Sequence, residues 1–200
     1  MDDAISYLVE KEIIFKKIID DYGLPIIPSR PEGFETLCKL ILEQQVSIES
    51  AKACFQKIEK LLKTVSPETI FKSSQEDLRS CGVSRQKINY LYHLSENILS
   101  DKIQLETFSQ KTDEEVRSEL IKIKGIGHWT IDVYLMFSLK SKDLIPLGDI
   151  AVINTIRELF DCYEKENIQK LTETWKPYRS MATYLLWHHY LSKRNRKVIF

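Results

Sequence analysis

Apolar residues recur every three or four positions along most of the chain, which is the spacing of helices that bury one face. Five residues form such a stripe in the first segment: Ile5, Leu8, Val9, Ile13 and Ile14. Alternation of apolar and polar positions, which indicates strands, is nearly absent. Ile26-Ile27 and the stretch 198–200 are apolar but too short to predict a sheet. The pattern therefore predicts an all-α protein.

Turn and capping residues divide this pattern into about ten short helices. Gly23 and Gly82 end helical stretches. The sequence Ser66-Pro67-Glu68 is typical of a helix start, because proline suits the first helical position. The sequence Thr112-Asp113-Glu114-Glu115 resembles a capping box. Further helices are expected over about 34–45, after Ser47, after Ser84, over about 128–139 and 149–160, and twice more towards the C-terminus.

Composition limits the size of the protein and its attraction to other molecules. The chain has 200 residues, 43% of them hydrophobic, which suits one compact domain or two small lobes that share a core. Lys plus Arg and Asp plus Glu both number 29, so bulk charge alone does not attract nucleic acid. Basic residues still gather near position 123 and at the C-terminus: Lys122, Lys124, Lys193, Arg194, Arg196 and Lys197. The C-terminal group is either a basic face or a solvated chain end.

Cysteine usage and the absence of targeting signals indicate the compartment. The four cysteines stand far apart, without a CxxC pair: Cys38, Cys54, Cys81 and Cys162. This spacing argues against zinc and iron–sulfur sites and favours free thiols in a reducing compartment. The N-terminus lacks the pattern of a signal peptide, and no apolar run has the length of a membrane span. We expect a cytoplasmic protein, or a nuclear one in a cell with a nucleus, without a membrane partner.

The most informative stretch is Ile123-Lys124-Gly125-Ile126-Gly127-His128-Trp129-Thr130, in which two glycines separate two helical patterns. Gly125 and Gly127 permit backbone angles that a side chain disfavours. The second helix is expected to begin near His128, where its first N–H groups and its dipole would attract a phosphate. The same pattern also fits an ordinary corner between two helices with a glycine cap.

Asp149 and Trp187 can each be interpreted in two ways, as a residue with a chemical role or as a residue with a structural one. Asp149 follows Pro146-Leu147-Gly148 at the start of a helix, where aspartate commonly acts as the N-cap. A carboxylate at that place could also act on a sugar bound beside it. Trp187 shares helical spacing with Tyr184 and Leu191, which on its own favours packing in the core.

Together these motifs resemble those of the helix-hairpin-helix DNA glycosylase superfamily. The stretch 123–130 is similar to its helix-hairpin-helix motif, and the stretch 146–149 is similar to its loop with proline and aspartate. The stretches 42–47 and 175–187 are similar to a turn near the DNA and a C-terminal pattern of the DNA-3-methyladenine glycosylase II branch. The motifs follow the family's order, which is more specific than any one of them.

The resemblance implies an all-α, two-lobed helical domain with a helix-hairpin-helix motif and a DNA-binding cleft between the lobes. Residues 1–200 are expected to form this single domain, because the N-terminal segment is too short for the β-rich domain of some relatives. The implied partner is double-stranded DNA that contains damaged bases. A monomer that requires no cofactor is expected.

The implied activity is that of a monofunctional DNA glycosylase in base excision repair. Such an enzyme flips out alkylated purines of the 3-methyladenine and 7-methylguanine type and hydrolyses the N-glycosidic bond. Asp149 is the implied catalytic residue, which stabilises positive charge at C1′ or orients the attacking water. Trp129 stands where bifunctional relatives carry a nucleophilic lysine, so no AP-lyase activity is expected.

The resemblance also implies which of the remaining site residues form the base pocket, contact DNA or bind a cation. The base pocket would contain Trp129, Trp187, Tyr184 and His188. Contacts with DNA would come from Gln45, Lys124, Gly125, Ile126, Gly127, His128 and Thr130, with Gln45 at the family's wedge position. A structural Na⁺ or K⁺ would be held by the backbone carbonyls of Ile121, Ile123 and Ile126, and no iron–sulfur cluster is expected.

Other functions fit the same residues. A non-catalytic helix-hairpin-helix DNA-binding module would use Asp149 only as a cap. A glycosylase for other damaged or deaminated bases, or a bifunctional glycosylase/lyase for oxidised bases, would share the fold, although the lyase lacks its lysine here. A helical protein-interaction domain would carry the glycine turn by coincidence and would not bind DNA.

Overall fold

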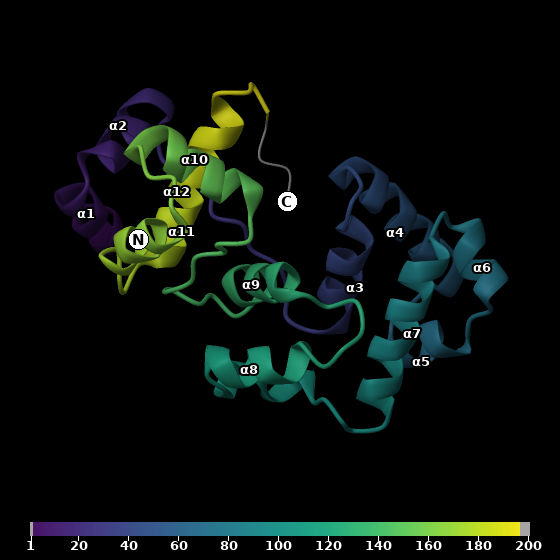
Figure 1. The fold of residues 1–200 in the computed structure, drawn as a ribbon. Helices are drawn as coiled ribbons and strands as arrows, with labels where there is room; N and C mark the ends of the chain where they lie inside the picture. Colours follow the sequence, from purple (N-terminus) through teal and green to yellow (C-terminus); the bar gives the residue numbers. More distant parts are fainter. Residues whose placement is uncertain (1, 197–200) are drawn as a thin grey trace. The chain divides into compact units, whose positions relative to one another are not determined.

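The computed structural model describes residues 2–196, and every regular element among them is a helix (Figure 1). The elements are α1 (Asp2–Lys11), α2 (Ile13–Tyr22), α3 (Phe34–Glu43), α4 (Ile48–Leu62), α5 (Pro67–Lys72), α6 (Gln75–Ser80), α7 (Arg85–Leu99), the 3-10 helix η1 (Leu105–Gln110), α8 (Asp113–Leu120), α9 (His128–Phe137), α10 (Ile150–Phe160), α11 (Lys165–Glu173) and α12 (Arg179–Ser192). The all-α prediction is confirmed for these residues. The apolar stretch 198–200 and the basic residue Lys197 lie outside the described residues.

Side-chain caps begin the helices where the sequence predicts them. Ser47 and Ser84 each accept a backbone N–H from three residues ahead, at 3.2 and 3.3 Å. Ser66 and Thr112 form capping boxes, in which the third helical residue returns a hydrogen bond to the cap's own N–H. The predicted starts of α4, α5, α7 and α8 are therefore confirmed.

Two stretches that the sequence pattern treats as continuous are each divided in two. Glu12 leaves the helical conformation, with φ −139° and ψ 111°, and separates α1 from α2. Ser73 is extended at the end of α5, and Ser74 caps α6 in a capping box with Asp77. Serine and aspartate side chains compete with the helix for nearby N–H groups, which explains the second break. The helix η1 is also absent from the prediction.

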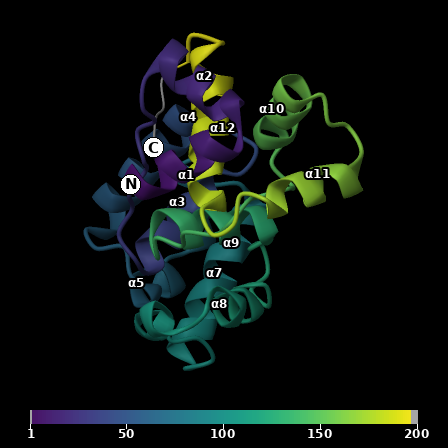
Figure 2. The same cartoon turned by 90° about the vertical axis from the view of Figure 1, so that its left-hand side faces the viewer.

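One compact unit combines residues 2–29 with residues 140–196. Helix α12 packs against α1, α2 and α10. Figure 1 and Figure 2 both show α1 and α2 close to α12. Trp175, which is fully buried, forms an aromatic cluster with Phe15 and Phe160, with ring centroids 5.1 and 5.3 Å from its own. This cluster joins α2 to the C-terminal helices, and α12 and the N-cap of α10 thereby stand on a rigid core.

The other compact unit consists of residues 30–139. Helix α7 packs against α3, α5 and α6, and α3 also contacts α4 and α9. Helix α9 is buried on nearly all sides, with residues 130–137 all inaccessible to solvent or nearly so. Arg117 of α8 forms an ion pair with Asp132 of α9 at 2.5 Å. Figure 1 and Figure 2 both show α8 beside α9. The two helices on either side of the glycine turn are therefore fixed to each other.

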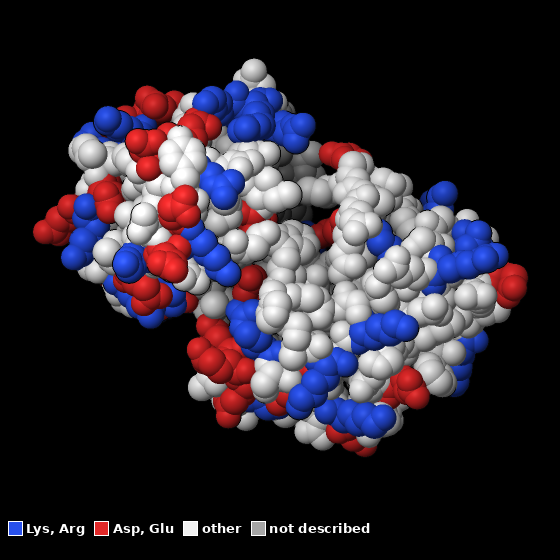
Figure 3. Space-filling model, in the orientation of Figure 1, with Lys and Arg blue, Asp and Glu red and all other residues white. Residues whose placement is uncertain are grey.

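Acidic and basic side chains are interspersed on the face shown in Figure 3, and neither sign covers either unit there. Part of the basic C-terminal group is used within the protein. Lys193 pairs with Glu158 at 2.5 Å, and the guanidinium of Arg194 lies 3.7 Å from the ring centroid of Tyr190. No helix within residues 2–196 combines the length and the apolar character that crossing a membrane requires.

Candidate functional site

The glycine turn connects α8 to α9 and needs glycine at one of its two positions. Gly125 has φ +92°, in the region that side chains rarely adopt. Gly127 is the N-cap of α9 with φ −100° and ψ 175°, which is ordinary extended backbone. The prediction that both glycines serve unusual backbone angles is therefore right for Gly125 and wrong for Gly127.

Residues from two other helices hold the turn in place. A Cβ atom at Gly125 would lie 2.1 Å from the Tyr90 ring of α7, so this ring lies directly against the glycine. The Gly125 carbonyl accepts a hydrogen bond from Gln44 Nε2 at 2.8 Å. The backbone N–H of Lys124 donates to Nδ1 of His93 on α7 at 3.1 Å. These contacts with α7 and Gln44 hold the backbone of the turn in one orientation without any ligand.

An open hollow of about 670 Å³ lies at this turn. Its lining joins the turn before α4 to the glycine turn: Glu43, Gln44, Gln45, Tyr90, Gly125, Ile126, Gly127, Trp129 and Thr130. The sequence analysis predicts six of these residues as site residues. It includes Glu43 and Gln44 only as part of the stretch 42–47, without a role of their own, and it does not predict Tyr90. Lys124 and His128, also proposed, are exposed but are not part of the lining.

The predicted DNA contacts at this hollow differ in which of their atoms are accessible. The side chains of Ile126 and Thr130 are 3% and 2% exposed, so only their backbone groups could reach a ligand. The Thr130 hydroxyl also accepts from Gln44 Nε2 at 3.3 Å. Gln45 is exposed and has φ +58°, a left-handed conformation that is uncommon for a residue other than glycine. Trp129 is 37% exposed.

The backbone around Ile123 bears on the expected cation site. The carbonyl oxygen of Ile123 accepts the N–H of Ile126 at 3.0 Å. A carbonyl oxygen has a second lone pair, so this bond leaves room for a further ligand. Carbonyl oxygens are hard donors of the kind that Na⁺ or K⁺ accepts, so the chemistry of the Ile123 carbonyl is compatible with such an ion. Within the described part of the chain, no group of three or more His, Cys, Asp or Glu residues could hold a metal.

In the other unit, Asp149 is the N-cap of α10, as its position in the sequence suggests. Its Oδ1 accepts the backbone N–H of Val152 at 3.0 Å and the indole Nε1–H of Trp187 at 3.2 Å. Its own N–H donates to the carbonyl of Pro146 at 2.9 Å, which closes a tight turn before the helix. The residue is only partly buried. Capping through Oδ1 does not by itself exclude a chemical role for this residue.

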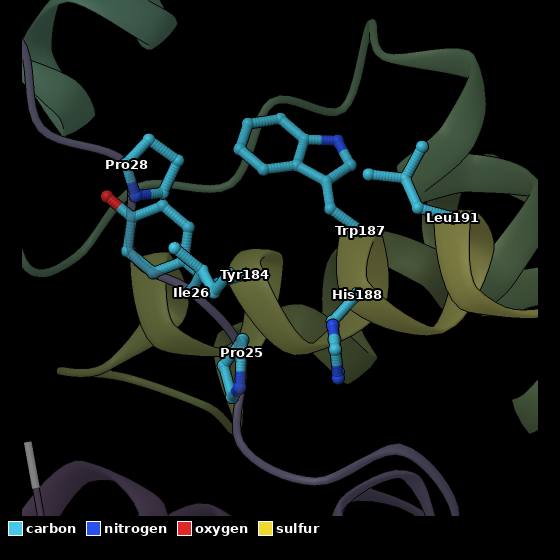
Figure 4. Close-up of a pocket in the computed structure, with 7 residues that line it drawn as sticks. All are labelled: Pro25, Ile26, Pro28, Tyr184, Trp187, His188 and Leu191. Atoms are coloured by element: carbon cyan, nitrogen blue, oxygen red, sulfur yellow. The ribbon is translucent and has the colours of Figure 1, made fainter. Parts of the chain in front are cut away.

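Three of the four residues predicted for the base pocket lie on α12 in this same unit. Trp187 and Tyr184 have ring centroids 6.2 Å apart at an interplanar angle of 49°. Burial raises the pKa of Tyr184 to about 12, so its phenol stays neutral. His188 points away from the Trp187 ring in Figure 4, and its Nε2 lies 3.1 Å from the carbonyl oxygen of Tyr22. Trp129, the fourth residue, belongs to the unit of residues 30–139.

A small pocket lies beside these α12 residues. Pro25, Ile26, Pro28, Tyr184, Trp187, His188 and Leu191 line it (Figure 4). Its volume of about 10 Å³ is what one water molecule needs. A purine does not fit there, so these seven residues do not form a complete base pocket by themselves.

The four cysteines are free thiols. Cys38 and Cys81 are buried, and Cys54 and Cys162 are partly buried. Burial raises the pKa of the Cys38 thiol, which makes it unreactive at neutral pH.

Known proteins with related sequences and structures point to one family. The chain is 34% identical over 136 residues to the alkylbase DNA glycosidase-like protein mag2 of Schizosaccharomyces pombe, a match that covers 66% of this chain and 63% of mag2. The crystal structure of a DNA-3-methyladenine glycosidase from Bacillus halodurans has a TM-score of 0.84 at 29% identity, over 96% of this chain and 91% of that one. The S. pombe 3-methyladenine DNA glycosylase Mag1 in complex with abasic DNA has a TM-score of 0.78 at 28% identity, over 92% and 95%.

The family model agrees with these matches and covers most of the chain. It includes the turn at Gln44 and Gln45, the glycine turn and the loop that ends at Asp149. Since the model for HhH-GPD superfamily base excision DNA repair proteins matches residues 38–180, the chain belongs to the HhH-GPD superfamily.

Proposed function

We propose that this protein is a monofunctional DNA glycosylase that hydrolyses the N-glycosidic bond of alkylated purines in base excision repair. The observation that carries the proposal is the carboxylate of Asp149, which lies within the segment that the family model matches and is held at the tip of α10 while only partly buried. Relatives named DNA-3-methyladenine glycosylase, among them one from S. pombe that is 29% identical over 86% of this chain, support the choice of substrate.

The chemistry needs only one carboxylate. As the base leaves, positive charge develops at C1′ of the deoxyribose, and a carboxylate nearby stabilises that charge or orients the attacking water. An alkylated purine is itself cationic, so it departs without a strong general acid. Asp149 supplies this carboxylate in the proposed reaction.

In this proposal, the glycine turn binds the phosphate backbone of double-stranded DNA. The first N–H groups of α9 and the positive end of its dipole bind a phosphate, with Lys124 and His128 exposed beside them. Gln45, exposed on a left-handed turn at the same hollow, enters the gap that the flipped nucleotide leaves. A monovalent cation on the carbonyls of Ile121, Ile123 and Ile126 would, when bound, offset the charge of that phosphate.

We expect the protein, as a monomer, to release free base from duplex DNA that contains 3-methyladenine or 7-methylguanine. The measurement is the quantity of released base together with strand breaks after alkali treatment. Duplexes with hypoxanthine, run in parallel, test for deaminated bases. DNA binding without base release from any of these duplexes would contradict the proposal and favour a non-catalytic DNA-binding module.

We expect no lyase activity, because an indole at position 129 offers no amine to attack C1′. Incubation with abasic DNA should leave the strand intact until alkali is added, and borohydride should trap no covalent adduct. A duplex treated with a known lyase serves as the positive control. A trapped adduct or a nick before alkali treatment would show that another amine acts as a nucleophile.

A further inference from the structure

The indole N–H of Trp187 has a charged partner. It donates to Oδ1 of Asp149 at 3.2 Å, while the indole ring lies beside the Tyr184 ring (Figure 4). The second tryptophan of this unit, Trp175, differs: its Nε1 is buried and has no hydrogen-bond partner among residues 2–196. One tryptophan therefore serves the core through its ring, and the other also reaches the carboxylate of the proposed reaction.

Donors from two different helices reach Asp149 Oδ1. The Val152 N–H ties the oxygen to the first turn of α10, and Trp187 ties it to α12. Each of these donors restricts rotation of the carboxylate about its side-chain bonds. Because they approach the same oxygen from two directions, together they set the direction of the carboxylate. Small errors in such a position are costly for catalysis.

Helix α12 is a rigid support for the indole. It packs against α1, α2 and α10, and Leu185 and Leu186, which precede Trp187, are fully buried. Tyr184 confines the ring from the preceding turn of the helix. An indole N–H that lost its partner in this partly buried place would carry a desolvation cost, which favours keeping the bond.

We infer that Trp187 is a positioning residue, which acts through Asp149 by holding its carboxylate with the indole N–H in addition to presenting an aromatic face. The inference rests on the proposed function, because it concerns the same reaction. The inference distinguishes two roles of Trp187 that the sequence alone does not separate. The aromatic ring contributes a packing face, which phenylalanine would also provide, whereas the indole N–H donates a hydrogen bond, which phenylalanine cannot.

The test compares Trp187→Phe, Trp187→Ala and Trp175→Phe in single-turnover excision of 7-methylguanine. We expect Trp187→Phe to lower the rate constant about 10- to 100-fold, nearly as far as Trp187→Ala, because a hydrogen bond to a charged group is lost in both. Affinity for abasic DNA should stay unchanged in Trp187→Phe. Trp175→Phe, the matched control for loss of an indole, should keep the rate below its melting temperature. A wild-type rate in Trp187→Phe would overturn the inference.

A spectroscopic readout tests the hydrogen bond without any reaction. In ¹H–¹⁵N spectra, the indole N–H resonance of Trp187 should move in Asp149→Ala, while that of Trp175 stays in place. An unmoved Trp187 resonance overturns the inference and leaves the proposed function intact if the wild type releases base. A wild type that releases no base overturns the proposed function, and the positioning role with it, even if the resonance moves.

Discussion

Replacing Asp149 with asparagine is expected to lower base release from alkylated DNA by roughly 100- to 1,000-fold, the loss typical when a group that stabilises transition-state charge is removed. Asparagine caps helices as well as aspartate does, so an oxygen remains for the Val152 N–H and the fold is kept. Only the negative charge disappears. Single-turnover excision, affinity for abasic DNA and thermal unfolding, measured on one preparation, should show loss of the first alone.

Two further variants separate the charge from the cap. Asp149→Ala removes both, so it should be as inactive as Asp149→Asn and also lose about 1 kcal/mol of unfolding free energy. Asp161→Asn is the matched control, because Asp161 is exposed in a left-handed conformation at the other end of α10, which asparagine tolerates. It should excise at the wild-type rate. Near-normal excision by Asp149→Asn would mean that this residue is only a cap.

Local signals in the sequence were enough to predict the helices whose starts depend on near neighbours. Ser47, Ser66, Ser84 and Thr112 each bond to a backbone N–H three residues away, so the pattern needed for the prediction lies within one turn. The break at Glu12 lacks a side-chain cap and leaves no such pattern. Apolar spacing alone does not reveal this break.

In the candidate site too, the sequence predicts features made of consecutive residues and does not predict hydrogen bonds between residues far apart in the chain. The glycine turn and the loop before α10 are recognisable because their residues are consecutive. Gln44, by contrast, reaches Gly125 across 81 positions, and Trp187 reaches Asp149 across 38. Neither bond has a sequence signal, since either side chain is also compatible with a helix surface or the core. Gly127 shows the converse error, because a glycine in a motif need not have a positive φ.

Gly125→Ala is expected to destabilise the unit of residues 30–139 by roughly 2–5 kcal/mol, since two costs coincide at one atom. The new Cβ would be placed 2.1 Å from the Tyr90 ring, and the backbone would be held at φ +92°. Relief of either strain must displace the turn. The phosphate-binding N–H groups would then lose their direction, so DNA affinity should fall together with stability. Chemical unfolding and titration with abasic DNA measure the two effects.

Gly127→Ala is the matched control, two residues away in the same turn. Its Cβ would meet no atom within 4 Å, and φ −100° is allowed for alanine, so the loss of stability should stay within about 1 kcal/mol, the cost of a poorer N-cap.

Gly125→Ala combined with Tyr90→Ala removes the clash but keeps the backbone strain. In the Tyr90→Ala background, the alanine at position 125 should therefore cost only about 1–2 kcal/mol. If Gly125→Ala and Gly127→Ala unfold alike, the ring of Tyr90 does not hold this turn, and the preformed phosphate site loses its physical basis.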